Sequence, residues 1–185
     1  MKGIWSWTAI LSLSCALCSA APPAAPEPAS HTDEGCGAFT WNLTREFAAM
    51  NQPAILLAAS ADQKVNPQRL AEGRHVAVTL VPQNSVSFVT APGRERKSDN
   101  PTAGLLFFKS GHAGRYRISL TSRHWIDVLD GGKPIESVSH EGRNGCELLR
   151  KVVEFELPAS RELVLQLSGD AAATAGILVT AVAKE

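Results

Sequence analysis

Residues 114–130, with the sequence GRYRISLTSRHWIDVLD, decide the fold. Their first half alternates apolar and polar side chains, as a strand with one buried face does. The alternation stops at residues 122–124, and an apolar run begins at Trp125. Asp130, Gly131 and Gly132 end this run and are suited to a tight turn. The segment therefore predicts two strands joined by a short polar link, forming a hairpin.

Asp127 is the least expected residue of this segment, because it stands between Ile126 and Val128 in the apolar run. A buried carboxylate is costly unless it is hydrogen-bonded or ion-paired. We therefore expect Asp127 to be a structural anchor or part of a site, and we favour the anchor. The donors that the sequence offers are Arg117, Arg150, Lys151 and the backbone amides of the turn at Gly131.

Strand patterns recur along the rest of the chain. Apolar or alternating runs cover residues 75–81, 104–108, 151–157, 162–167 and 177–182, and Gly, Pro and Asp separate them. Roughly six to eight short strands at this spacing predict an all-β protein, an antiparallel, jelly-roll-like β-sandwich. A short N-terminal helical segment is expected to begin with Thr44 as its cap. Residues 54–61 fit a second short helix or an extended run.

One hydrophobic core is predicted from the apolar faces of these runs. Its expected members are Phe39, Trp41, Leu106, Phe108, Tyr116, Ile118, Leu120, Val153, Phe155, Leu163 and Leu165.

The N-terminal residues predict export. Lys2 precedes an apolar run that ends in the small residues 18–20, which is the order of a secretory signal peptide cleaved after about residue 20. Residues 21–34 then form a Pro/Ala-rich spacer, and residues 35–185 a single β-sandwich domain. A lipoprotein acylated at Cys15 or Cys18 is the alternative. We expect a periplasmic or secreted protein with no transmembrane segment after cleavage.

Cysteine counting predicts one disulfide. Of the four cysteines, Cys36 and Cys146 remain after cleavage. A pair of cysteines in an oxidising compartment is usually joined. Two separate buried thiols are the alternative.

Charge and motifs exclude several classes of function. The 18 basic residues balance the 18 acidic ones, so nucleic-acid binding is not expected. The sequence contains no nucleophile elbow, phosphate-binding glycine loop or paired-histidine metal motif, so we assign no catalytic residue and no cofactor. The candidate polar site comprises His124, Asp127, His140, Arg150 and Lys151. A metal site would require convergence of weaker candidates, which are His112, His124, His140 and Glu141.

Several motifs resemble those of a group of small exported bacterial proteins. They are Gly35-Cys36-x-x-Phe39-x-Trp41, Gly114-x-Tyr116-x-Ile118-x-Leu120, Trp125-Ile126-Asp127-Val128 and Cys146-x-x-x-x-Lys151-x-Val153-x-Phe155. Many of those proteins carry the automatic name homogentisate 1,2-dioxygenase, which implies a cupin with iron held by two histidines and a glutamate. This sequence has no paired-histidine cupin motif. More loosely, the late hairpins look like the sandwich domains appended to secreted bacterial peptidases.

Three functions follow as hypotheses. The leading one is an exported non-catalytic β-sandwich that binds a protein or envelope-surface partner in the periplasm. The resemblance implies the second, a metal-dependent iron dioxygenase. The third is a carbohydrate-binding module, for which Trp41 and Trp125 are the aromatic candidates.

Overall fold

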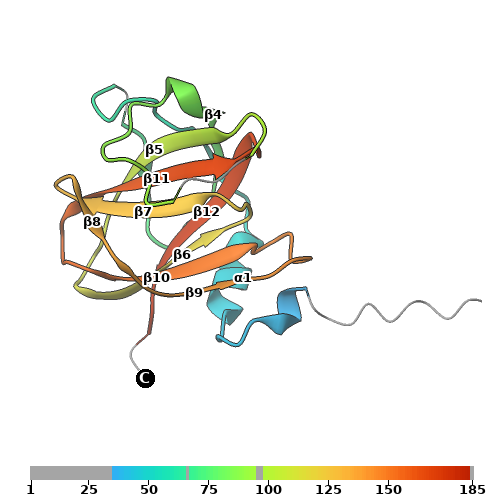
Figure 1. The fold of residues 1–185 in the computed structure, drawn as a ribbon. Coiled ribbons are helices and arrows are strands. Elements are labelled where there is room, and N and C mark those ends of the chain that lie inside the picture. The colour runs from blue at the N-terminus through green and yellow to red at the C-terminus, as the bar shows by residue number, and fades with distance from the viewer. Residues whose placement is uncertain (1–34, 66, 95–97, 184–185) are drawn as a thin grey trace, which may run out of the picture. The chain divides into compact units, whose positions relative to one another are not determined.

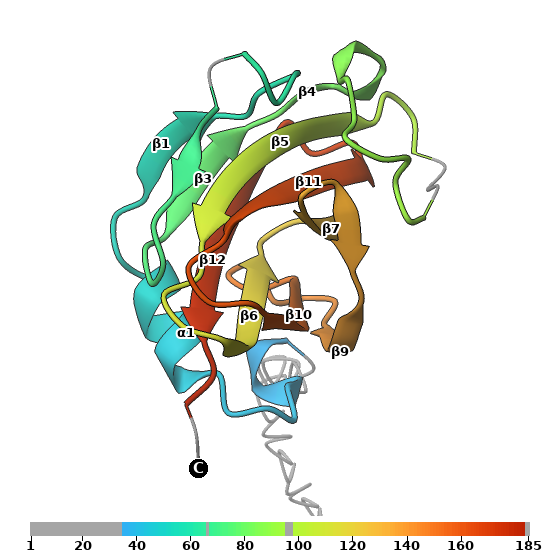
Figure 2. The same cartoon turned by 90° about the vertical axis from the view of Figure 1, so that its left-hand side faces the viewer.

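Two six-stranded β-sheets pack against each other and form most of the protein (Figures 1 and 2). The computed structural model describes residues 35–65, 67–94 and 98–183, all within one compact unit, Thr32–Glu185. The predicted signal peptide and spacer, residues 1–34, lie outside the described residues. The predicted all-β sandwich is confirmed.

The first sheet consists, in spatial order, of β1 (Ile55–Ala58), β3 (Val76–Thr79), β12 (Thr174–Ala181), β6 (Gly114–Leu120), β10 (Lys151–Leu157) and β9 (Ser137–Gly142). The second consists of β2 (Arg69–Leu70), β5 (Thr102–Lys109), β11 (Glu162–Asp170), β7 (Trp125–Asp130) and β8 (Lys133–Ile135), with β4 (Val81–Pro82) also paired to β5. The described helical elements are α1 (Thr44–Met50) and the short 3-10 turns η1 (Cys36–Ala38) and η2 (Gln83–Ser85).

Most strand pairs are antiparallel, but the sheets are mixed. β1 runs parallel to β3, and β2 runs parallel to β5. The predicted antiparallel pairing therefore does not extend to these two edges, and the jelly-roll likeness stays a prediction. The ambiguous residues 54–61 contain strand β1 rather than a helix.

The stretch at 114–130 does form two strands, β6 and β7, but they do not pair with each other. β6 lies between β12 and β10 in the first sheet, while β7 lies between β11 and β8 in the second. The predicted hairpin is wrong, because residues 121–124 carry the chain from one sheet to the other. The segment consequently supplies buried side chains to both inner faces, among them Ile118 and Val128.

The main core lies between the sheets and contains most of the predicted members. These are Leu106, Phe108, Tyr116, Ile118, Leu120, Val153, Phe155, Leu163 and Leu165. Phe39 and Trp41 are exceptions, because they pack against a second cluster that includes Leu43, Met50 and Leu178. Leu178 alternates with Ile177 and Val179 of the main core, so this second cluster covers the outer face of the first sheet.

A disulfide and a short helix fix the N-terminal segment. Cys36 and Cys146 are joined as predicted, with 2.08 Å between the sulfur atoms. The predicted cap at Thr44 is displaced by one residue, because Leu43 occupies the cap position and makes no side-chain capping bond. The carboxamide oxygen of Asn42 instead accepts the backbone N–H of Thr44 at 3.1 Å.

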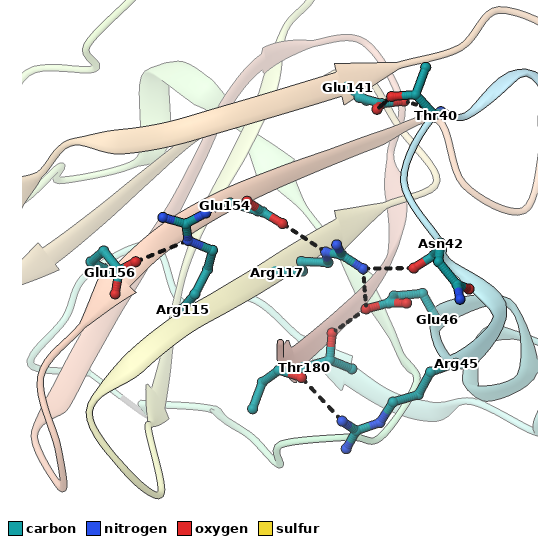
Figure 3. A network of polar contacts seen from close by, with 11 residues as sticks. Thr40, Asn42, Arg45, Glu46, Arg115, Arg117, Glu141, Glu154, Glu156 and Thr180 are labelled. Carbon is teal, nitrogen blue, oxygen red and sulfur yellow. Dashed lines mark hydrogen bonds and ion pairs between the residues drawn. The ribbon is translucent and has the colours of Figure 1, made fainter. Parts of the chain in front are cut away.

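A buried charge network holds this segment on the first sheet (Figure 3). Arg117 on β6 donates to the carboxylate of Glu154 on β10 and to the backbone carbonyl of Asn42, both at 2.9 Å. Its guanidinium also lies 3.5 Å from Glu46 on α1, which accepts a hydrogen bond from Thr180. Glu46 and Glu154 are both buried, so Arg117 compensates two carboxylates, with Arg115 also 3.6 Å from Glu154.

Candidate functional site

A cleft of about 330 Å³ opens where β7 of the second sheet faces β9 and β10 of the first. The buried Ile126 and Val153 form its apolar base. Its more accessible lining residues are Arg94, Trp125, Ser137, His140 and Lys151. We call this the Trp125 cleft.

Trp125 is the aromatic centre of the cleft and is half-buried. The ammonium nitrogen of Lys151 lies 5.5 Å from the centroid of its ring, and the guanidinium carbon of Arg94 lies 5.8 Å from it. Both distances fall within the range of cation–π attraction. The indole N–H donates to a carboxylate oxygen of Asp127 at 2.8 Å. These contacts fix the orientation of the Trp125 ring.

Asp127 is held by N–H donors that the sequence reasoning did not identify. Besides Trp125, the backbone amide of Gly93 donates to it at 3.2 Å and the side-chain amide of Gln166 at 3.4 Å. The predicted donors were Arg117, Arg150, Lys151 and the turn at Gly131, and none of them makes a described bond to it. A Cβ at position 93 would lie 2.8 Å from the carboxylate, so only glycine approaches this closely. This geometry supports an anchoring role for Asp127.

Replacing Asp127 with asparagine is expected to lower the free energy of unfolding by about 1–3 kcal/mol. In the variant, an NH2 group would replace one carboxylate oxygen. It would face the N–H groups of Trp125, Gly93 and Gln166, which now donate to Asp127. Urea denaturation would measure the loss. Glu162→Gln is the matched control, because this exposed carboxylate pairs with the exposed Arg69, and the substitution should cost less than about 1 kcal/mol. Unchanged or higher stability of Asp127→Asn would contradict the anchor.

His124 lies behind the cleft with its side chain fully buried. Its ring forms hydrogen bonds with the hydroxyls of Ser122 (2.8 Å) and Thr102 (3.0 Å), and a carboxylate oxygen of Asp170 lies 3.8 Å away. Burial lowers the pKa of His124 to about 4 and outweighs the opposing effect of Asp170, so the ring is neutral. Its backbone carbonyl accepts a hydrogen bond from the ammonium of Lys151 at 2.8 Å. His124 thus positions Lys151 without lining the cleft.

The pKa of His124 predicts a loss of stability in mild acid. The unfolded chain protonates this histidine near pH 6.5 and the folded chain only near pH 4, so its contribution is complete above 6.5 and falls as the pH drops. The decrease should reach about 3 kcal/mol between those pH values. Urea denaturation at a series of pH values would measure it. His124→Asn should flatten the dependence, whereas His112→Asn should leave it unchanged; an equal slope in all three proteins would contradict the assignment.

Glu141 faces away from the cleft and forms a separate buried contact. It accepts hydrogen bonds from the amide and hydroxyl of Thr40 and pairs with Arg143 at 2.9 Å. Although burial raises the pKa of Glu141, the Thr40 hydrogen bonds and the Arg143 charge outweigh it and hold the pKa below its usual value. Its contribution to stability is present above the ordinary carboxyl pKa and is lost only below it. The loss from Glu141 therefore begins near pH 4.5, whereas the loss from His124 begins near pH 6.5.

The predicted polar site is only partly brought together. His140 and Lys151 both line the Trp125 cleft, whereas Arg150 lines a second hollow, which Lys151 also borders, together with Arg123 and Arg143. His112 is exposed, with its ring nitrogen 3.2 Å from the carbonyl of Ala113.

No metal centre assembles among the residues that the structure describes. No group of three or more His, Cys, Asp or Glu side chains is placed to hold an ion there. The convergence of His112, His124, His140 and Glu141 that a metal site would require is therefore not found among the described side chains.

A wider hollow of about 750 Å³ lies beside α1 and includes Trp41. The guanidinium carbon of Arg117 lies 5.1 Å from the Trp41 ring centroid, and this arginine also pairs with Glu46. The charges there are engaged with each other, so the Trp125 cleft is the better candidate site. Arg94 and Ser137 of that cleft were missed by sequence reasoning, because isolated loop and edge residues carry no periodic signal.

In comparisons with known proteins, no family model, curated protein or solved structure matches this chain. Within the described residues, no helix has the length and apolar character needed to cross a membrane.

Proposed function

We propose that this protein is an exported, non-catalytic β-sandwich that binds a protein or envelope-surface partner through the Trp125 cleft. The observation that carries the proposal is the cleft itself, an apolar base beside an oriented tryptophan with two cations against its ring. Binding sites typically combine an apolar lining with a few placed polar groups, and Trp and Arg are over-represented where binding energy concentrates.

The chemistry of the cleft favours an anionic group attached to an apolar or sugar moiety. Lys151 and Arg94 supply positive charge, and Ser137 and His140 supply hydrogen-bonding groups. The nearby carboxylate of Asp127 already accepts N–H bonds from Trp125, Gly93 and Gln166. A carboxylate, phosphate or sulfate on the partner fits this arrangement.

The disulfide supports the export part of the proposal. Cys36 and Cys146 are bonded, and such bonds persist in oxidising compartments such as the periplasm or the extracellular medium. The signal-peptide pattern of residues 1–20 is consistent with the same location.

A carbohydrate-binding module is the second candidate function, and the partial exposure of Trp125 in the cleft favours it. Sugar rings commonly stack on such aromatic faces. The iron dioxygenase implied by the resemblance finds no support in the described side chains, because its candidate ligands lie apart.

Titration of the isotope-labelled mature chain with four small probes tests the proposal. Phenyl phosphate and glucuronate carry a charge, whereas benzyl alcohol and glucose are their neutral counterparts. We expect the two anionic probes to shift the NMR signals of the Trp125 indole and of His140. Lys151→Met should weaken this binding about tenfold, which corresponds to one charge-assisted hydrogen bond.

Lys109→Met is the matched control, because Lys109 is exposed at the end of β5 and does not line the cleft. It should bind the probes as the parent does. Equal shifts with glucose and glucuronate would favour the carbohydrate-binding function over anion recognition. No shift at the cleft with any probe would overturn the proposal.

A further inference from the structure

Strand β1 forms an open edge of the first sheet (Figure 2). Its sequence is Ile-Leu-Leu-Ala, with no charge and no proline. Ile55 is 40% exposed and Leu56 is 80% exposed, the largest value among the exposed large apolar side chains of the described chain. An edge strand with these properties is a template for pairing with another strand.

The other sheet edges in the described part of the chain are protected. β9 carries the exposed His140 and has an irregular register against β10. β8 carries Lys133 and Pro134, while the two-residue β2 carries Arg69 and β4 contains Pro82. Charges, prolines, bulges and short length are the features that prevent strands from pairing between molecules. β1 is short, but it has no charge, proline or bulge.

The backbone of β1 presents unpaired groups to the outside. The amide of Ile55 donates to the carbonyl of His75, and the amide of Ala59 donates to that of Thr79. Residues at every second position of a strand point their backbone groups to the same side. The odd-numbered residues of β1 therefore bond to β3, and Leu56 and Ala58 direct their N–H and C=O groups to the open edge.

We propose that β1 pairs with β1 of a second copy of this chain, antiparallel and around a two-fold axis at Leu57. In that register Leu56 lies opposite Ala58 of the second copy, and each pair exchanges both of its backbone hydrogen bonds. The large Leu56 side chain lies beside the small Ala58 of the second copy. The two-fold axis produces the same contact a second time. β1 itself carries no charge that would oppose the contact, and the two-fold axis closes the assembly as a dimer.

The Pro/Ala-rich residues 21–34 of the chain do not fit this edge. They include Pro22, Pro23, Pro26 and Pro28, which have no N–H to donate to a neighbouring strand. The four-residue pairing is small beside the roughly 800 Å² per partner of a stable interface. The dimer should therefore be weak, with a dissociation constant on the order of 100 μM.

Sedimentation velocity of the mature chain over a range from about 10 μM to about 1 mM tests the pairing. The parent should shift from monomer to dimer across this range. Ala58→Pro removes an outward N–H and no bond to β3, so it should stay monomeric. Leu56→Lys adds a charge at an exposed position and should also stay monomeric.

Val138→Lys is the matched control, because Val138 is a 47% exposed apolar residue on the opposite edge strand β9. It should dimerise as the parent does, and circular dichroism should show that all variants remain folded. A parent that is monomeric throughout overturns the proposal and leaves the open edge to a strand from another protein. A dimer that persists in both β1 variants also overturns it.

Discussion

Replacing Arg117 with methionine is expected to lower the free energy of unfolding by about 3–5 kcal/mol. The arginine side chain is 13% exposed and pairs with Glu154 at 2.9 Å and Glu46 at 3.5 Å. Methionine preserves the volume of the stem but removes the cation shared by two buried carboxylates, and leaves Glu154 with only the more distant Arg115 at 3.6 Å. Such a loss is much larger than that of a surface ion pair. Urea denaturation at neutral pH would measure it.

Arg69 provides the matched control for this experiment, because Arg115 also lies 3.6 Å from the buried Glu154. Arg69 is on β2, is 59% exposed, and pairs with the exposed Glu162 at 2.7 Å. Arg69→Met should therefore cost less than about 1 kcal/mol. A triple variant, Arg117→Met with Glu46→Gln and Glu154→Gln, should recover most of the stability, because it removes Arg117 together with both buried carboxylates that it compensates. A cost below about 1 kcal/mol for Arg117→Met alone would contradict the network.

Removing the disulfide is expected to cost a similar amount, about 4–5 kcal/mol on the chain-entropy description. The bonded cysteines are 110 residues apart, so the bond closes a long loop and restricts the unfolded chain strongly. The variant Cys36→Ala with Cys146→Ala should show this loss in urea denaturation. The parent in reducing buffer should show the same loss.

Hydrogen exchange would show where the cysteine variant loosens. Faster exchange is expected first in α1 and the residues around it, because the disulfide ties this segment to the sheet that it covers. The inner strands β6 and β11 should keep slow exchange. A variant as stable as the parent to within about 1 kcal/mol would contradict the expected role.

Local patterns were sufficient to predict which residues form strands, but not which strands pair. Tyr116, Ile118 and Leu120 alternate with polar residues, and all three are buried in the main core. The neighbours of β6 are β10 and β12, which begin more than 30 residues later in the chain. Phe39 and Trp41 alternate in the same way but pack on the outer face of the first sheet. Periodicity identifies a buried face without identifying its partner.

The candidate site was predictable only in part, for a related reason. Asp127 stood out because a carboxylate is unusual in an apolar run, and Lys151 and His140 were named as polar candidates. Two of the groups that bond Asp127, Gly93 and Gln166, are 34 and 39 residues away from it in sequence. The disulfide could be predicted without knowledge of the fold. The expected compartment and the number of remaining cysteines leave one possible pair.

The close approach of Gly93 to Asp127 separates two tasks between neighbouring residues. The backbone amide of Gly93 holds its loop in place by donating a hydrogen bond to Asp127. A side chain at position 93 would collide with that carboxylate. Arg94, the next residue, extends its side chain over Trp125 at the cleft. The residue that holds the loop is thus distinct from the residue that lines the cleft. Mutation at position 94 can change the charge of the cleft while the attachment of the loop persists, so this charge can vary in evolution or redesign without loss of the loop.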